Sequence, residues 1–278
     1  PQEYFLDSRG CIQNPLGLTG SRLDVDVHVV TCDTALAQNV VNAVNRAQMR
    51  VHKLILQHLA SAEAVLTGDE KELGSAVIDI GAGTTDISVL VRDSVRFTAT
   101  LPVAGNHFDR DLAVGLRTPL DEAERIKMEC GHALLEGIAE DEMIEVPGVG
   151  SRAARPMSRR FACEVLHHRA VELLEMVREA LDKAGTREEL MAGAVLTGGG
   201  SLLRGMTELA EQVLGMPART GVPSGIRGLT DELSRPIYAT AIGLAMLSAR
   251  DDEMFPARSG KGAGSPWLVS RILSWVGG

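Results

Sequence analysis

Residues 77 to 86 constrain the fold of this chain more than any other segment, because an apolar run ends there in a glycine-rich turn. The segment reads Val-Ile-Asp-Ile-Gly-Ala-Gly-Thr-Thr-Asp. Glycine permits positive φ and close approach of another group, and successive N–H groups in such a turn form a concave anion site. The threonine hydroxyls are further donors, and the first aspartate can hold a hydrated divalent cation. The motif predicts a strand-turn-strand cradle for a metal-bound phosphate. Its predicted residues are Asp79, Gly81, Gly83, Thr84 and Thr85.

A tight hairpin, in which the glycines serve only the turn, is the alternative interpretation of this motif. A second glycine loop, residues 197–201, follows a predicted buried strand at 194–196 and precedes a helix that ends near residue 214. The N–H groups of such a loop favour an anion or a nucleotide, although a plain strand–helix turn has the same pattern. The chain has no G-x-x-x-x-G-K-[ST] motif and neither loop has a third spaced glycine, which excludes a P-loop and disfavours a Rossmann site.

The hydrophobic pattern predicts a mixed α/β chain. Alternation predicts a strand over 23–31, a helix capped by Asp33 or Thr34 follows over 36–47, and a second strand is expected over 51–56. Together these segments predict a β-α-β unit with parallel strands. A helix of small residues over 59–66 is suited to close packing as a connector between domains. Strands over 87–91 and 95–103 imply an antiparallel meander with the cradle strand.

Further helices are expected over 106–116, from Pro119 onward, over 161–184 and over 238–249, whereas residues 140–158 are expected to be irregular. The net charge of −9 argues against a nucleic-acid partner. The four cysteines are far apart, as in a reduced cytosolic protein, and no apolar run is long enough to span a membrane. The chain starts at Pro1 without a methionine, so we expect it to be part of a longer protein.

The last residues differ in character from the rest. Residues 250–264 are polar and glycine-rich and predict a flexible linker. Residues 265–276 place their apolar side chains on one helical arc, which predicts a helix lying in a membrane interface, with a packed helix as the alternative. The expected lipid contacts are Trp267, Leu268, Ile272, Leu273, Trp275 and Val276.

The two glycine loops, in this order and spacing, resemble those of the actin-like ATPase superfamily, which holds a nucleotide between two lobes. The chain resembles in particular the FtsA family of bacterial cell-division proteins. The matching segments are residues 1–4, 14–18, 59–61, 79–86, 104–106, 123–127, 196–200, 238–244 and the tail.

The resemblance implies an α/β, actin-like (ribonuclease H-like) two-lobe ATPase fold with a partial first lobe and a C-terminal amphipathic helix. Residues 1–72 would be the rest of the first lobe, with an FtsA-type 1C subdomain and a connector helix. Residues 73–250 would be the second lobe with the nucleotide loops, and their final helix would return to the first lobe. Residues 251–264 would be the linker, and residues 265–278 the membrane-targeting helix.

The resemblance also implies ATP and Mg²⁺ as cofactors, with Asp79 near the metal. Beyond the cradle, it implies a further phosphate contact at Gly105 and Asn106, and a pair meeting the ribose and adenine at Glu124 and Lys127. The latter two could instead form a solvated ion pair three residues apart. The adenosine loop would be Gly198, Gly199 and Gly200.

Two departures from the family pattern bear on activity. The first phosphate hairpin would precede Pro1, so half of the phosphate clamp lies outside this sequence. Gln57 and His58 replace the Glu-Pro pair with which relatives orient water. Because Gln57 can orient a water molecule but is no base, we expect at most weak hydrolysis, and we expect His58 only to pack or face solvent.

The function implied by the resemblance is polymerisation and tethering of FtsZ filaments to the cytoplasmic face of the inner membrane at the division site. The partners would be lipid, further copies of the chain and the FtsZ C-terminal peptide, with Arg159 and Glu164 as peptide contacts. A sugar- or acid-kinase relative and a PilM-type pilus-assembly adaptor are the alternatives.

Overall fold

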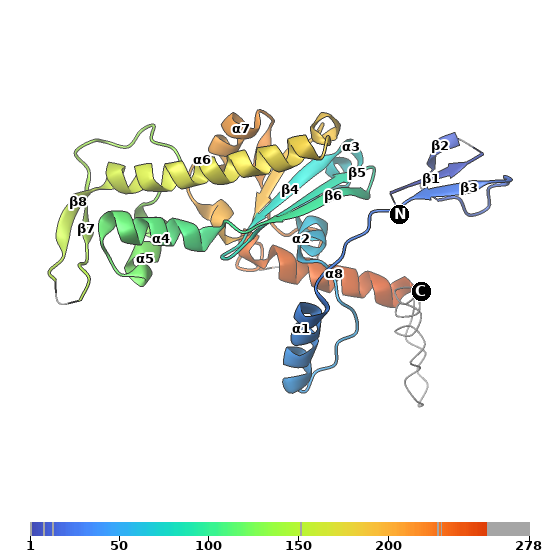
Figure 1. Cartoon of the computed structure of the whole chain (residues 1–278), viewed down its shortest axis with the longest axis horizontal. Helices are drawn as coiled ribbons and strands as arrows, with labels where there is room; N and C mark the ends of the chain where they lie inside the picture. The colour runs from blue at the N-terminus through green and yellow to red at the C-terminus, as the bar shows by residue number, and fades with distance from the viewer. Residues whose placement is uncertain are drawn as a thin grey trace.

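A five-stranded mixed sheet forms the centre of the computed structural model, which describes residues 2–7, 9–12, 14–150, 152–226, 228 and 230–254 (Figure 1). Its strand order is β10-β9-β4-β5-β6. The strands are β4 (Ser75–Ile80), β5 (Thr85–Val91), β6 (Ser94–Leu101), β9 (Gly193–Thr197) and β10 (Ala218–Thr220). β9 runs parallel to both β4 and β10, whereas β4, β5 and β6 pair antiparallel in sequence order. The predicted meander is therefore confirmed.

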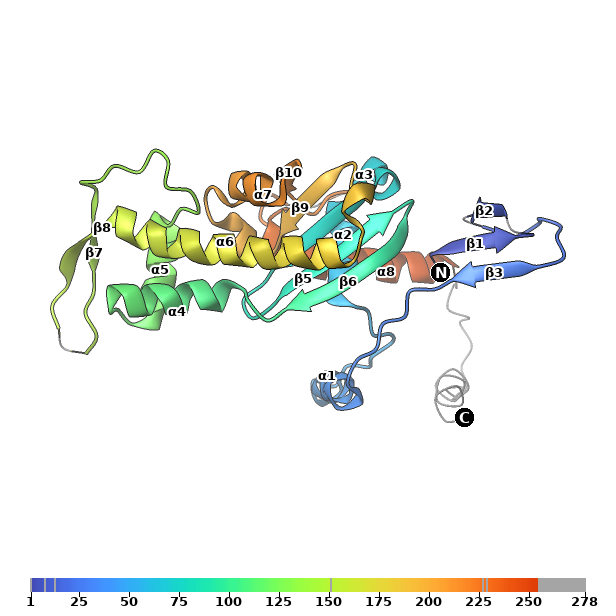
Figure 2. The ribbon, with the colours of Figure 1, turned by 45° about the horizontal axis from the view of Figure 1, so that its top comes forward.

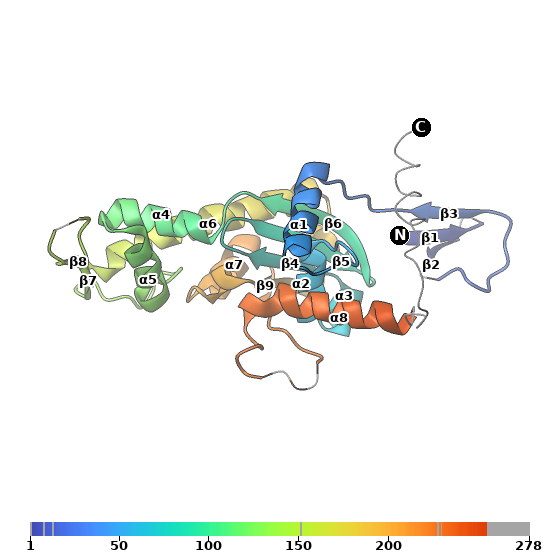
Figure 3. The same ribbon diagram turned by 90° about the horizontal axis from the view of Figure 1, so that it is seen from below.

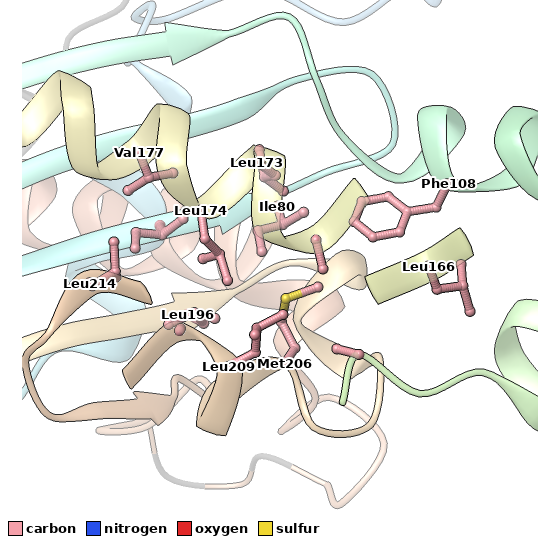
Figure 4. Close-up of a cluster of buried hydrophobic side chains, with 14 of the residues drawn as sticks. Ile80, Phe108, Leu166, Leu173, Leu174, Val177, Leu196, Met206, Leu209 and Leu214 are labelled. Carbon is pink, nitrogen blue, oxygen red and sulfur yellow. The ribbon is translucent and has the colours of Figure 1, made fainter. Parts of the chain in front are cut away.

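The helices α6 (Arg159–Lys183) and α7 (Met206–Leu214) cover one face of this sheet. The Ser158 hydroxyl caps α6 by accepting a hydrogen bond from the Phe161 N–H, the kind of cap that serine supplies well. Leu173 and Leu174 on α6 are fully buried, and Figure 4 shows them beside Leu196 and other side chains of the main core. Each such side chain contributes roughly 1.5–3 kcal/mol by leaving water, so α6 is the main cover of this face.

The helices α2 (Gln57–Val65) and α8 (Ala239–Met254) cover the opposite face and cross each other there (Figure 3). α2 buries small side chains, including Ala60, Ala62 and Ala64. Gly243 of α8 lies so close to Ala60 that a Cβ atom on it would overlap the Ala60 backbone. The close packing expected of this small-residue helix is therefore present. α8 continues to Met254, so the first residues of the predicted linker are helical.

Two helices and a hairpin lie beyond one end of the sheet, to the left in Figure 1. They are α4 (Gly105–Leu116), α5 (Leu120–Cys130), β7 (Met143–Val146) and β8 (Arg155–Ser158). β7 and β8 pair antiparallel, with Ile144 opposite Met157. The expectation of an irregular segment over 140–158 was therefore wrong, because two four-residue strands separated by a loop rich in glycine and proline show too little alternation to be recognised.

The N-terminal residues form a small separate sheet, seen on the right in Figure 2. Its strands are β1 (Glu3–Leu6), β2 (Arg9–Ile12) and β3 (Leu23–Asp26), in the order β2-β1-β3. All pairings are antiparallel, so the predicted parallel β-α-β unit was wrong. The helix α1 (Thr34–Arg46) does follow, capped by Asp33 as predicted. Residues 51–56 form no strand, because none of the described strands pairs with them.

The remaining short elements connect the larger ones: α3 (Gly68–Leu73), η1 (Arg187–Glu189), η2 (Gly199–Leu202) and η3 (Pro236–Tyr238). The predicted amphipathic helix over 265–276 and most of the predicted linker lie outside the described residues. Within the described ranges, no helix combines the length and the apolar character needed to cross a bilayer.

A half-buried ion pair ties α3 to the outer strand β10. Arg219 Nε and Nη2 each donate to one oxygen of Glu70 at 2.6 Å, and Arg219 Nη2 also donates to the Val65 carbonyl at 2.8 Å. The hydrogen bonds from Arg219 are the main cause that holds the pKa of Glu70 below its ordinary value of 4.5. Because the folded-state pKa is depressed, the pair stabilises the fold fully above pH 4.5 and loses this effect as the pH falls through the folded-state value.

We therefore expect Glu70→Gln to lower the free energy of unfolding by about 1 kcal/mol at pH 7, after allowance for solvent screening. Urea unfolding followed by circular dichroism at pH 7 and pH 3 measures this, and the difference from the unmodified chain should shrink at pH 3. Glu179→Gln is the control, because Glu179 pairs with an exposed lysine on the surface of α6. A Glu70→Gln chain as stable as the control at pH 7 would contradict the expectation.

Candidate functional site

A cavity of about 450 Å³ opens between the turn after β4, the loop after β9 and the helices α4 and α5. Its size is that of an ordinary small-molecule site. Seven of the residues predicted from the sequence line it: Gly81, Gly105, Asn106, Glu124, Lys127, Gly199 and Gly200. The structure therefore brings the two glycine loops, which are far apart in the sequence, to one shared crevice.

The parallel pairing of β4 and β9 explains why the loops meet. Asp79 and Thr197 are partners in register, so both strands end at the same edge of the sheet. Gly198 has a φ of +79°, and a Cβ there would overlap the Asp79 carboxylate, so only glycine fits easily. Gly199 is different, because the nearest atom to an added Cβ is Ile237 Cγ2 at 3.8 Å. Gly198 therefore sets the approach of the two loops, and Gly199 faces the pocket.

The N-terminus of α4 packs directly on the turn after β4. The Gly105 N–H donates to the Gly81 carbonyl at 3.0 Å, and the Asn106 N–H donates to the Ala82 carbonyl at 2.8 Å. These two N–H groups are therefore already used within the protein. The predicted phosphate contact at this position would therefore have to come from the Asn106 side chain, which is exposed at the pocket.

The two threonines of the turn have different surroundings. Thr84 is exposed. Thr85 is fully buried at the start of β5, and its hydroxyl donates to the Val103 carbonyl at 2.7 Å. The hydroxyl of Thr85 thus holds β5 to the segment that follows β6, whereas a phosphate contact was expected of it. Thr84 and Gly83 remain the solvent-facing residues of the predicted cradle.

Two carboxylates lie side by side on the sheet below the turn. Asp79 and Asp86 are cross-strand partners on β4 and β5, and both are nearly fully buried. Burial is the main cause that raises the pKa of Asp79, the Ser61 hydrogen bond counteracts it, and the Asp86 charge raises it further. The Thr100 hydroxyl donates to Asp86 at 2.6 Å.

Two side chains at the start of α2 face these carboxylates. The Gln57 side chain hydrogen-bonds to Asp79. His58 is buried, and this burial lowers its pKa. The negative charges of Asp86 and Asp79 act in the opposite direction but are the smaller effect. Of the two settings expected for His58, packing or solvent, the structure shows packing.

A metal ion would find few direct protein ligands here. Among the described residues, no group of three or more His, Cys, Asp or Glu side chains is arranged to hold a metal. Magnesium commonly keeps several waters and takes its other ligands from one or two carboxylates and from substrate phosphates. A Mg²⁺ ion carried by a nucleotide would therefore need only one carboxylate of the protein, such as that of Asp79, which is buried below the pocket.

Lys127 is held by a residue that the sequence did not single out. Its Nζ lies 2.7 Å from Asp109 Oδ1, and the Asp109 side chain is only 7% exposed. Lys127 thus pairs with a residue of α4. The alternative prediction, an ion pair between Lys127 and Glu124 within α5, is not the one observed. Glu124 remains exposed at the pocket.

We expect Asp109→Asn to weaken ATP binding by roughly fivefold, because losing this ion pair costs about 1 kcal/mol and leaves the Lys127 ammonium free to move. Isothermal titration calorimetry with Mg-ATP measures this. Asp111→Asn is the matched control, since Asp111 lies on the same helix but pairs with Arg169 on α6, outside the pocket. Equal affinities for the two variants would contradict the role given to Asp109.

The two predicted peptide contacts on α6 have different settings. Arg159 donates to both oxygens of Glu142, at 2.7 and 2.8 Å, and to the Cys130 carbonyl at 2.9 Å. Its side chain is only 17% exposed, so it holds β7 and α5 to α6. Glu164 is more exposed and pairs with Arg160 at 3.4 Å.

Sequence reasoning missed Asp86, Asp109, Arg204 and Arg235. The second acid of the glycine motif was a signal for Asp86. The other three line the pocket from α4, the segment before α7 and the segment before η3. They carry no local signal, because only the packing of distant segments brings them to the pocket.

The central sheet, the crossed helices and the shared pocket define the class of this protein, which is the actin-like fold. MreB5 of Spiroplasma citri bound to ADP superposes with a TM-score of 0.67 at 18% identity, over 81% of this chain and 68% of that one. The MamK double helical filament gives 0.58 at 17% identity, over 78% and 66%. The PilM-PilN type IV pilus biogenesis complex gives 0.55 at 21% identity, over 76% and 57%.

The chain belongs to the FtsA family of cell-division proteins. The model of the family described as cell division protein FtsA matches residues 76–243, and that of the SHS2 domain inserted in FtsA matches residues 1–31. Cell division protein FtsA of Pseudomonas aeruginosa is 42% identical over all of this chain and 68% of its own length. That of Escherichia coli K12 is 43% identical over 88% of this chain and 60% of its own length. The chain thus spans about two thirds of the relatives it matches.

Proposed function

We propose that this protein binds ATP in the pocket between its glycine loops, polymerises, and tethers FtsZ filaments to the cytoplasmic face of the inner membrane at the division site. Membership of a cell-division family supports the cellular role. The observation that carries nucleotide binding is the convergence of the two glycine loops and the helices α4 and α5 on one cavity of about 450 Å³. A similar fold, MreB5, has been solved with ADP, which agrees with this proposal.

The pocket supplies contacts suited to each part of an adenine nucleotide. Gly199 and Gly200 leave a flat surface for the adenosine, and Glu124 offers a carboxylate to the ribose hydroxyls. Lys127 is fixed by Asp109 beneath this position. The turn after β4 faces the phosphates with Gly83 and Thr84, and bound Mg²⁺ would neutralise phosphate charge beside Asp79.

We expect hydrolysis to be slow, so that nucleotide occupancy regulates assembly rather than driving rapid turnover. Gln57 contacts Asp79 and could orient a water molecule, but an amide does not accept a proton at neutral pH. A sugar- or acid-kinase activity would instead need transfer of phosphate to an acceptor. An assay with radiolabelled ATP and candidate acceptors distinguishes these two activities.

The FtsZ C-terminal peptide is the proposed protein partner, and the start of α6 is the proposed docking region. Because Arg159 is bound to Glu142 and Cys130, we assign it to shaping this surface. Glu164 is sufficiently exposed to contact a peptide directly. We also propose that the domains end where the sequence predicts, at residues 72 and 250.

The proposed membrane contact comes from residues 265–278, which lie outside the described residues. Their two tryptophans and aliphatic side chains suit a helix in the membrane interface, and a single short helix of this kind binds reversibly. Polymerisation would then strengthen attachment by bringing many copies to one surface.

Liposome flotation with FtsZ polymers tests the tethering proposal. The full chain should float and carry FtsZ with it, whereas a chain ending at residue 264, or one with Trp275→Glu, should stay at the bottom with FtsZ. Trp275→Glu places a charge in the apolar arc, so release follows from the cost of burying it. Equal flotation of the truncated chain would refute the membrane contact. If the full chain floats but leaves FtsZ at the bottom, FtsZ is not its partner.

A further inference from the structure

One oxygen of the Asp79 carboxylate is held by hydroxyl groups from both helices on this side of the sheet. Ser61 Oγ on α2 donates to Asp79 Oδ2 at 2.6 Å. Thr240 Oγ1 on α8 lies 3.3 Å from the same oxygen and 2.9 Å from Ser61 Oγ. Ser61 is fully buried and Asp79 is 3% exposed, so water does not compete freely for these contacts. We call these three residues the hydroxyl–carboxylate triad.

The triad lies beside the point where α2 and α8 touch. Ala60, the neighbour of Ser61, contacts Gly243, which is about one helical turn beyond Thr240. The helices are joined there by backbone contact rather than by flexible side chains. A shift of either helix at this crossing would therefore change the geometry of both hydroxyls around Asp79.

The other side of Asp79 lies against the loops that line the candidate nucleotide pocket, although Asp79 itself is buried below it. Asp79 Oδ1 lies against Gly198, which begins the loop of Gly199 and Gly200. Gly81, which lines the same pocket, follows Asp79 by two positions. Asp79 thus stands between the two loops of the pocket on one side and the crossed helices on the other.

We propose that Ser61 and Thr240 are positioning residues that fix the orientation of the Asp79 carboxylate toward a magnesium-bound nucleotide and couple occupancy of the pocket to the α2–α8 crossing. This inference rests on the proposed binding of Mg-ATP. Each hydroxyl has one hydrogen to donate, so the carboxylate is held by a small, directional set of bonds. Without them the Gln57 hydrogen bond remains, but the carboxylate is held less firmly, and the part of the affinity that depends on magnesium declines.

The coupling follows from the same bonds. A nucleotide that contacts Asp79 through hydrated magnesium restrains the carboxylate. The hydroxyls of Ser61 and Thr240 transmit this restraint to α2 and α8. Binding of Mg-ATP should therefore slow amide hydrogen exchange in both helices. A purely structural triad would support the fold equally with and without ligand and would show no such change.

The test compares Ser61→Ala and Thr240→Val with Thr240→Ser, in the full chain. The first two remove a hydroxyl at nearly constant volume, and the third retains it. Ser75→Ala is the matched control, because Ser75 is also fully buried on β4, but at the opposite end, where it donates to the Glu70 carbonyl. Calorimetry with ATP, in magnesium and in EDTA, is combined with hydrogen exchange of α2 and α8.

We expect Ser61→Ala and Thr240→Val to weaken Mg-ATP binding by roughly tenfold, as losses of residues behind a metal ligand do, and to leave ATP binding in EDTA unchanged. Exchange protection of α2 and α8 by Mg-ATP should disappear in both and return in Thr240→Ser. If the unmodified chain binds Mg-ATP and these variants match Ser75→Ala in both readouts, the triad is only structural and the inference fails. If the unmodified chain binds no nucleotide, the proposed function fails with it.

Discussion

Replacing Gly243 with alanine is expected to lower the free energy of unfolding by about 3 kcal/mol, the upper range for overpacking of a tight contact. The added Cβ would overlap the carbonyl carbon and oxygen of Ala60. Backbone atoms cannot turn aside, so α2 and α8 would have to separate. The loss is notable because alanine is otherwise favoured over glycine in a helix by roughly 1 kcal/mol.

Urea unfolding followed by circular dichroism measures this effect. Gly115→Ala is the matched control, since Gly115 is also in a helix but its new Cβ would meet only side-chain atoms, the nearest in Val165 at 3.3 Å. That side chain can adjust, so this variant should retain its stability. A Gly243→Ala chain as stable as the control would show that the helices do not cross as closely as described.

Replacing Gly199 with leucine is expected to weaken ATP binding by about 100-fold, because filling an occupied site costs on the order of 3 kcal/mol and each 1.4 kcal/mol is tenfold. Among the three glycines of the loop, Gly199 alone has room for a side chain, which would enter the pocket. Gly198 and Gly200 would clash with the end of β4, so changing them would confound folding with binding.

Calorimetry with Mg-ATP gives the affinity, and thermal unfolding of the free protein shows whether the fold survives. Gly68→Leu is the control, because Gly68 also has open space around a Cβ but lies on α3, away from the pocket. The control should bind as the unmodified chain does. Unchanged affinity in a folded Gly199→Leu chain would remove the loop from the nucleotide site.

Local patterns were sufficient for the parts of the fold that position the site. The apolar run before Gly81 and the alternation after it specify β4, β5 and their antiparallel pairing. Asp33 marks the start of α1, and the small residues of α2 indicate its close packing. These predictions succeeded because propensity, capping and periodicity all act within a few residues.

The failures have a different physical origin. Residues 51–56 have the composition of a strand, but a strand exists only where another provides its hydrogen-bonding partner, and none of the described strands does. β7 and β8 pair through residues whose own pattern is weak. Strand pairing is a tertiary property, so neither result could be read from local periodicity.

The candidate site shows the same division. The glycines were recognisable because their conformational role is local, whereas the Asp109 partner of Lys127 depends on how α4 packs on α5. Thr85 looked like a phosphate ligand from its position in the motif, yet its hydroxyl is used by Val103. A motif therefore places residues near a ligand more reliably than it says which atoms are free to bind it.

Photolabelling with 8-azido-ATP, followed by mass spectrometric mapping of the labelled peptides, tests the shared pocket most directly. If the loop after β9 and the helix α5 hold the adenine, label should appear within residues 120–131 or 197–204, and excess ATP should prevent it. Label confined to other segments, or insensitive to ATP, would contradict a single nucleotide site between the two glycine loops.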